Sequence, residues 1–114
     1  MSPARDAELS FMKHYEGSRT IDGIRVTVNG TPLDPRYDLA VFTRLGFEWS
    51  YEGEAPRQLS LALIADAVGG DLALQWSKPF MTSVVLCLDN DWRLTDEEIR
   101  KTVSYTHLTL PTKA

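Results

Sequence analysis

A helix that is apolar on nearly every side constrains this chain more than any other feature. Residues 56–68 carry two adjacent apolar stripes at helical spacing: Leu59, Ala62, Leu63 and Ala67, then Leu61, Ile64, Ala65 and Val68. Such a helix has to be buried, because it leaves only a narrow polar side for water. Pro56 is expected to open it, and Gly69-Gly70 to end it with a left-handed cap. The remaining segments must therefore pack around residues 56–68.

The residues before this helix are predicted to form an antiparallel sheet. Residues 24–28 alternate apolar and polar side chains, as a half-buried strand does. Asn29-Gly30 follows directly and predicts a type I′ hairpin turn, because both residues tolerate positive φ. The returning strand over 31–33 should be short or lie at an edge, since Pro32 lacks a backbone donor. Lys13–Glu16 is the expected neighbouring strand.

A second alternating segment, residues 46–51, reads GFEWSY. Alternation would place Phe47, Trp49 and Tyr51 on one face and Glu48 and Ser50 on the other. We therefore expect a strand at the centre of the core here.

Further helices are expected after Gly70. Asp71 would cap a short helix as far as Trp76, and Pro79 would start a new one rather than continue it. The new helix would carry Phe80, Val84 and Leu88, although the β-branched run over 83–88 also fits a strand.

Residues Thr95–Glu98 match a capping box and predict the start of the last helix. In such a box the Thr95 hydroxyl accepts from the Glu98 backbone N–H, and the Glu98 carboxylate accepts from the Thr95 backbone N–H. Ile99 would be its first core contact. Strands followed by helices predict an α+β domain, in which an antiparallel sheet of about three to four strands packs on the buried central helix and two to three further helices.

The folded unit is predicted to be one domain over residues 12–102. Residues 1–11 are polar and without period, which indicates a disordered or mis-assigned start, with Met12 as the alternative beginning. Residues 103–112, VSYTHLTLPT, resemble the conceptual translation of a sequencing adapter, so 103–114 is predicted to be a non-native tail.

Composition narrows the classes of function. The chain has 114 residues, 12 Lys and Arg against 16 Asp and Glu, and a net charge of −4, with its basic residues mostly isolated. Binding to nucleic acid is therefore not expected, although it stays an alternative. The longest apolar run, 61–65, is far too short to span a bilayer. A lone cysteine, Cys87, fits a reducing cytoplasm and is expected to be buried and inert.

No catalytic residue, metal site or cofactor is predicted. Asp34, Asp38, Glu48, Glu52 and Glu54 could in principle form a carboxylate pair or a cation site, but nothing in their spacing fixes a geometry. His14 has no partner with metal-ligand spacing. The glycines form neither a phosphate-binding loop nor a dinucleotide fingerprint.

Several blocks nevertheless resemble a family of small bacterial and phage-encoded domains of unknown function. They are Tyr15–Arg19, Val26–Leu33, Gly46–Trp49 with Tyr51 and Gly53, Pro56 with Gln58-Leu59 and Leu61–Leu63, and Trp92 with Leu94-Thr95 and Ile99. The resemblance implies a fold and a bacterial or mobile-element context, without an established activity. Family members often carry a polar Asn-His-Ser-Pro-like run before Gly46, where this chain has Ala40–Leu45.

The preferred interpretation is a small non-enzymatic cytoplasmic module that binds another protein. It would bind through a sheet edge or the turn over 51–57, where aromatic and Arg side chains suit an interface. The candidate binding residues are Tyr51, Glu52, Glu54, Arg57 and Trp92. A nucleic-acid-associated accessory protein and an enzyme using a carboxylate cluster are the alternatives.

Overall fold

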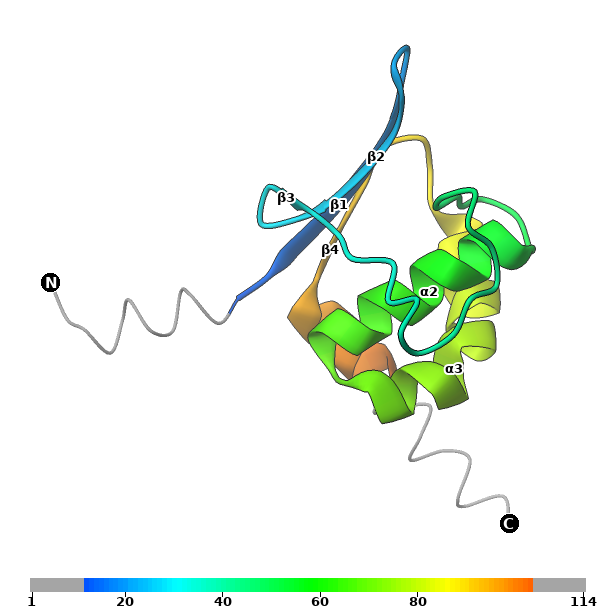
Figure 1. Ribbon diagram of the computed structural model, residues 1–114. Coiled ribbons are helices and arrows are strands. Elements are labelled where there is room, and N and C mark those ends of the chain that lie inside the picture. Colours follow the sequence, from blue (N-terminus) through cyan, green and yellow to red (C-terminus); the bar gives the residue numbers. More distant parts are fainter. Residues whose placement is uncertain (1–11, 104–114) are drawn as a thin grey trace, which may run out of the picture.

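The computed structural model describes residues 12–103, which form two layers (Figure 1). Four antiparallel strands make a sheet in the order β3-β2-β1-β4, and the helices pack against one face of it. The elements are β1 (His14–Thr20), β2 (Gly23–Val28), β3 (Thr31–Pro32), α2 (Glu54–Ala67), α3 (Gly70–Ser83), a 3₁₀ helix η1 (Val85–Cys87), β4 (Trp92–Thr95) and a last helix whose described part covers 96–103. The predicted α+β class is therefore confirmed.

The predicted hairpin lies between β2 and β3. Asn29 and Gly30 have φ of 51° and 85°, the left-handed values that a type I′ turn requires. β3 is only two residues long and pairs Thr31 with Val28 and Pro32 with Thr27. Because the chain leaves the sheet at once, this edge strand is as short as Pro32 suggested.

The fourth strand, β4, is an element that the sequence pattern does not single out. Its four residues pair antiparallel with β1, with Trp92 opposite Gly17 and Arg93 opposite Glu16. Trp92 is buried on the helix side of the sheet, whereas the Arg93 guanidinium pairs with Glu16 at 3.0 Å on the other face. A strand this short has too few alternations to be recognised without its partner.

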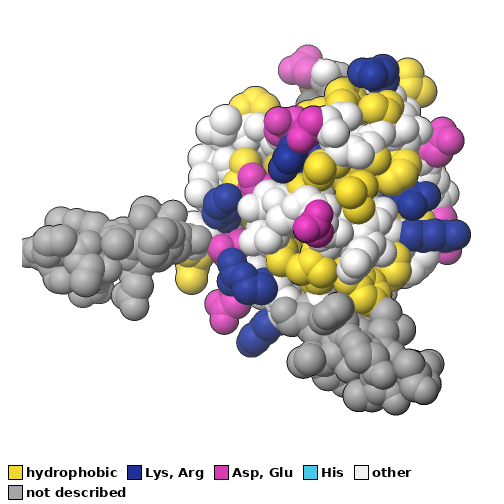
Figure 2. Space-filling model, turned by 60° about the horizontal axis from the view of Figure 1, so that its bottom comes forward, with side chains coloured by type: hydrophobic (Ala, Val, Ile, Leu, Met, Phe, Trp, Pro, Cys, Tyr) yellow, Lys and Arg dark blue, Asp and Glu magenta, His cyan; other side chains and the backbone are white. Residues whose placement is uncertain are grey.

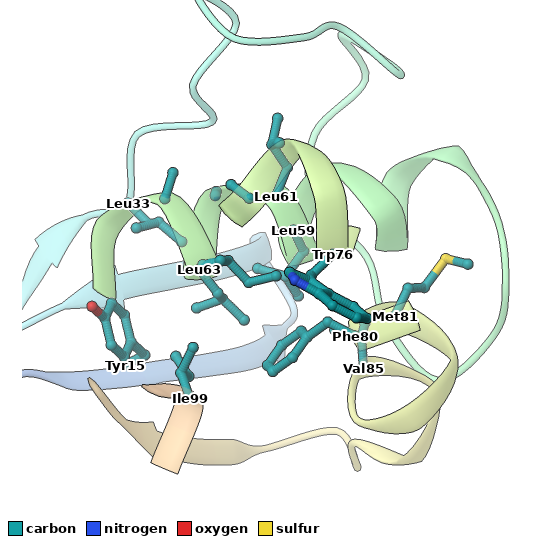
Figure 3. Close-up of a cluster of buried hydrophobic side chains, with 14 of the residues drawn as sticks. Tyr15, Leu33, Leu59, Leu61, Leu63, Trp76, Phe80, Met81, Val85 and Ile99 are labelled. Carbon is teal, nitrogen blue, oxygen red and sulfur yellow. The ribbon is translucent and has the colours of Figure 1, made fainter. Parts of the chain in front are cut away.

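Helix α2 packs on α3 and supplies the centre of the core (Figure 3). Leu59, Leu61, Leu63 and Ile64 have no exposed surface. Figure 3 shows Tyr15 and Ile99 at one end of this cluster and Trp76 and Phe80 at the other, with Leu63 between them. The helix begins at Glu54, two residues before the expected start, so Pro56 lies within its first turn.

The two glycines after α2 separate it from α3 without a left-handed cap. Gly69 has φ 139° and ψ 163°, an extended mirror-image conformation that glycine adopts far more readily than other residues. Its carbonyl accepts the first hydrogen bond of α3, from the Ala73 N–H at 3.1 Å. The expected cap type was therefore wrong, although glycine does break the helix here.

Helix α3 corrects a second expectation, because it continues through Pro79. Asp71 does not cap it; the residue before its first turn is Gly69. A proline inside a helix removes one backbone hydrogen bond and costs about 3 kcal/mol. Burial of Trp76, Phe80 and Met81 against the core offsets this cost. After Ser83 the chain continues as η1, so residues 83–88 do not form the alternative strand.

Residues 46–51 do not form a strand, so the prediction of a central strand here was wrong. They run as an irregular segment in which Gly46 and Ser50 have φ of 112° and 80°, values outside the extended region. Trp49 is fully buried, but Phe47 is only half-buried and Tyr51 is exposed. Of the three side chains expected in the core, only Trp49 is fully buried. The tertiary contacts of Trp49 position this segment, and strand pairing does not.

The capping box before the last helix is confirmed. The Thr95 N–H donates to Glu98 Oε1 at 2.9 Å, and the Glu98 N–H donates to Thr95 Oγ1 at 3.1 Å. Ile99 is buried, as expected, and so is Val103. The predicted start over 1–11 and nearly all of the predicted tail over 103–114 lie outside the described residues.

Cys87 is exposed at the end of η1, so its predicted burial was wrong. The 3₁₀ turn directs Val85 into the core and leaves the third residue of the turn facing outward. Within residues 12–103, no helix is both long and apolar enough to cross a membrane.

Candidate interaction surface

The segment that carries most candidate residues is fixed to the sheet by Arg19. Its guanidinium donates to Glu48 Oε1 at 2.9 Å, to the Trp49 carbonyl at 2.7 Å and to Asn90 Oδ1 at 2.6 Å. The guanidinium carbon also lies 4.6 Å from the centre of the Trp49 ring, a cation–π distance. One side chain of β1 therefore holds both the loop before Tyr51 and the loop before β4.

Trp49 and Ser50 complete this attachment. Trp49 Nε1 donates to the Asp89 carbonyl at 2.6 Å, and the Ser50 N–H donates to the Val85 carbonyl at 3.0 Å. Since its neighbours are held by β1, η1 and the loop before β4, Tyr51 leaves the core at a defined place.

A buried amide holds the other loop that reaches this surface. Gln58 has no exposed surface, and its Oε1 accepts from the Phe42 and Thr43 N–H groups at 2.7 and 3.2 Å. Its Nε2 donates to the Pro35 and Ala40 carbonyls at 2.8 and 3.1 Å. All four hydrogen-bonding positions of the amide are occupied. Phe42 is thereby placed against the start of α2.

Three of the predicted residues meet around one shallow hollow of about 370 Å³ at the start of α2. Glu52, Glu54 and Arg57 line it together with Phe42, Lys78 and Met81. Tyr51 is 47% exposed beside it, and its ring lies over Gly53, where an added Cβ would come within 2.8 Å of a ring carbon. The rim is therefore charged, and its apolar part comes from Phe42 and Met81.

Arg57 is less free than the sequence suggested. Its guanidinium carbon lies 4.1 Å from the centre of the Phe42 ring, and its Nε donates to Ser77 Oγ at 3.2 Å. Ser77 in turn is buried, and its carbonyl accepts from Ser60 Oγ at 2.6 Å. Arg57 therefore joins α2, α3 and the loop at Phe42, and its first role is to hold this surface together.

Lys78, Met81 and Phe42 were not among the predicted residues. Lys78 and Met81 are three positions apart on α3, a spacing that places them on one helix face. That signal was hidden because Pro79 suggested a helix boundary between them. Phe42 comes from a loop without a repeating pattern, so only the tertiary structure brings it here.

Trp92 does not belong to this surface. It is buried in the sheet layer, with its ring edge-to-face against Trp49 at a centroid distance of 5.7 Å. An added Cβ at Gly17 would lie 2.3 Å from Trp92 Nε1, so the indole ring rests directly on the glycine. Its expected role as an exposed anchor is not supported, because the ring packs inward.

The five candidate carboxylates do not gather at one place: Glu52 and Glu54 line the hollow, and the other three lie elsewhere. Glu48 pairs with Arg19 and Asp38 with Arg36, each at 2.9 Å, while Asp34 accepts from the Arg36 N–H. The Arg36 hydrogen bond holds the pKa of Asp38 below its usual value. Among residues 12–103, no three His, Cys, Asp or Glu side chains gather in a metal-binding arrangement.

Tyr15 and Lys13 hold the N-terminal end of β1 in place. Burial, reinforced by a 2.7 Å hydrogen bond from its hydroxyl to Asp66, raises the pKa of Tyr15 far above its usual value. Lys13 also pairs with Asp66, at 3.3 Å. These contacts fasten β1 to the end of α2. The raised pKa of Tyr15 is therefore explained by its structural role in packing.

The structure is that of a small two-layer α+β domain, with a shallow, charge-rimmed hollow at the start of α2. A family of unknown function, DUF6166, matches residues 15–105, and the chain belongs to that family. The resemblance to an uncharacterised domain family is thus confirmed. No curated protein and no solved structure matches the chain.

Proposed function

We propose that this protein is a small non-enzymatic module that binds another protein through the hollow at the start of α2. The observation that carries the proposal is the composition of the rim. Exposed Tyr51 stands beside the carboxylates of Glu52 and Glu54, which have no ion-pair partner within residues 12–103, and Phe42 and Met81 supply apolar surface. Tyr is one of the residues in which the binding energy of protein interfaces is concentrated.

The rigidity of the base supports this function. Arg19, Gln58 and Arg57 hold the segments that supply the rim, so little order has to be gained on binding. A partner with a basic residue near an apolar side chain would complement Glu52, Glu54 and the apolar floor.

The charge distribution does not favour the nucleic-acid alternative. The net charge is −4, and the face shown in Figure 2 carries Lys, Arg, Asp and Glu side chains of both signs between small hydrophobic patches. Phosphate binding needs several basic side chains on one surface. The bacterial or phage origin and the cytoplasmic location follow from the resemblance and the single cysteine, and they belong to this proposal.

The test is retention of a partner by the full tagged chain from a lysate of a bacterium that encodes a protein of the same family, with and without nuclease. Tyr51→Ala and Glu52→Lys/Glu54→Lys should lose a nuclease-resistant protein partner. Asp22→Lys/Glu97→Lys, an equal charge change at two exposed positions away from the hollow, should retain it. Arg57 is left unchanged because its loss would disturb the surface itself.

Material that disappears with nuclease would favour the nucleic-acid alternative. A partner retained equally by all variants would place binding elsewhere and refute this surface. If no protein is retained by the unmodified chain, the module proposal fails, and small-molecule screening for the enzyme alternative becomes the next step.

A further inference from the structure

The outer edge of β2 is only partly covered. β2 has six residues, but β3 pairs only with Thr27 and Val28. The Val26 carbonyl accepts from the Leu33 N–H at 3.1 Å, so backbone alternation turns the N–H and C=O of Ile24 toward the same outer edge. In the described part of the chain, no strand pairs with Ile24 there. An extended segment can add to such an edge.

An apolar groove of about 420 Å³ runs along this edge. Ile24, Val26 and Pro32 form its sheet side, and Leu45 and Phe47 from the following loop form its other side. Leu45 is 97% exposed and Ile24 is 39% exposed. Exposed apolar side chains gathered in one patch often mark a binding surface.

Two arginines beside this groove lack carboxylate partners. Arg25 is the charged residue of the lining, and Arg44 is adjacent to Leu45. Neither guanidinium makes a hydrogen bond or an ion pair within residues 12–103, and that of Arg44 only stacks on the Tyr37 ring at 4.9 Å. The other described arginines bond carboxylates or, for Arg57, a serine hydroxyl. On a protein with an excess of acids, these guanidinium groups are available to an incoming carboxylate.

We propose that this groove binds an extended acidic-apolar segment of a partner protein as an added strand. The segment hydrogen-bonds to the Ile24 backbone, seats an apolar side chain between Ile24, Leu45 and Phe47, and pairs a carboxylate with Arg25 or Arg44. A second copy of this chain fits less well, because pairing two β2 edges about Ile24 would put both Arg25 side chains diagonally on one face without an acid between them. The proposal goes beyond the function proposed above, since no residue of this groove lines the hollow at α2.

The probe is a displayed library of random 12-residue peptides, selected on the full chain. Enriched peptides should combine β-branched or aromatic residues with Asp or Glu, and Leu45→Ser should weaken the best peptide at least tenfold. Arg25→Glu/Arg44→Glu should reverse the preference toward Lys or Arg. Leu74→Ser, which removes an exposed leucine from α3, is the matched control and should leave binding unchanged.

Backbone amide spectra locate the peptide, which should shift the Ile24 and Arg25 signals. The proposal is overturned if no peptide is enriched, or if the enriched peptides bind Leu45→Ser as well as they bind the unmodified chain. It is also overturned if light scattering finds a dimer that Leu45→Ser dissociates, because the occupant is then a second copy. Peptides lost only by Tyr51→Ala would support the hollow at α2 and refute the groove.

Discussion

At the scale of single residues, the blocks that carry the family resemblance act mainly by packing. Gly17 makes room for Trp92, Arg19 holds Trp49, and Gly53 accommodates the ring of Tyr51. These residues determine where the loops lie. The charged and apolar groups of the candidate surface come from neighbouring residues.

Gly17→Ala should destabilise the protein by about 1–3 kcal/mol, because the new methyl group would overlap the buried Trp92 ring at 2.3 Å. Urea unfolding followed by tryptophan fluorescence measures the effect. Ser18→Ala, one residue further along β1, is the control and should change stability by less than about 0.5 kcal/mol. Equal stability of the two variants would contradict the close contact.

Asp96 should make stability depend on pH in the acid range. Burial alone would raise its pKa, but hydrogen bonds from the Lys13 N–H and Arg100 outweigh burial and hold the pKa below the usual 3.8. A lowered folded-state pKa adds stability above pH 3.8, and this is lost as pH falls through the folded-state value.

Asp96→Asn should therefore be less stable than the unmodified chain at pH 7. It should also lose less stability between about pH 5 and pH 2, a range that spans the usual carboxyl pKa of 3.8. Chemical denaturation at a series of pH values measures both. Parallel curves for the two proteins would assign the acid dependence to other carboxylates.

At the scale of elements, two loops without regular structure are held by side chains from regular ones. Gln58 of α2 holds the loop at Pro35–Thr43, and Arg19 of β1 holds the loop at Glu48–Ser50. The candidate surface at the start of α2 depends on both attachments.

Gln58→Leu should release the first of these loops, because it leaves two N–H groups and two carbonyls without partners. Each buried unsatisfied group costs about 1–3 kcal/mol, so a loss of at least about 2 kcal/mol is expected even after the loop relaxes. Hydrogen exchange at the Phe42 and Thr43 amides should accelerate. The control is Gln75→Leu, at an exposed position of α3. Unchanged exchange at both amides would show that the loop is held by other contacts.

At the scale of the whole molecule, α2 connects the two layers, so the domain should unfold as one unit. Leu63 lies in the middle of the core shown in Figure 3, and Leu63→Ala should cost about 2–5 kcal/mol. Tryptophan fluorescence and far-ultraviolet circular dichroism should report a single coincident transition. Two separate transitions would show that the sheet and the helices are stable independently.

The sequence alone determined the elements whose signals are local. The apolar stripes predicted the buried helix, Asn29-Gly30 the hairpin turn, and Thr95 with Glu98 the start of the last helix, because each depends on neighbouring residues. The α+β class followed from their order. Part of the candidate surface could also be predicted, because four of its residues lie close together along the chain: Tyr51, Glu52, Glu54 and Arg57.

Only the tertiary structure decided the remainder, because it depends on contacts between distant segments. Helix α3 continues through Pro79 because one of its faces is buried in the core. Residues 46–51 do not form a strand despite their alternation, because Trp49 occupies a core position. Trp92 turned inward because Gly17, 75 positions earlier in the chain, leaves space for its ring. Lys78, Phe42 and the groove between Ile24 and Leu45 likewise join segments whose proximity no local pattern encodes.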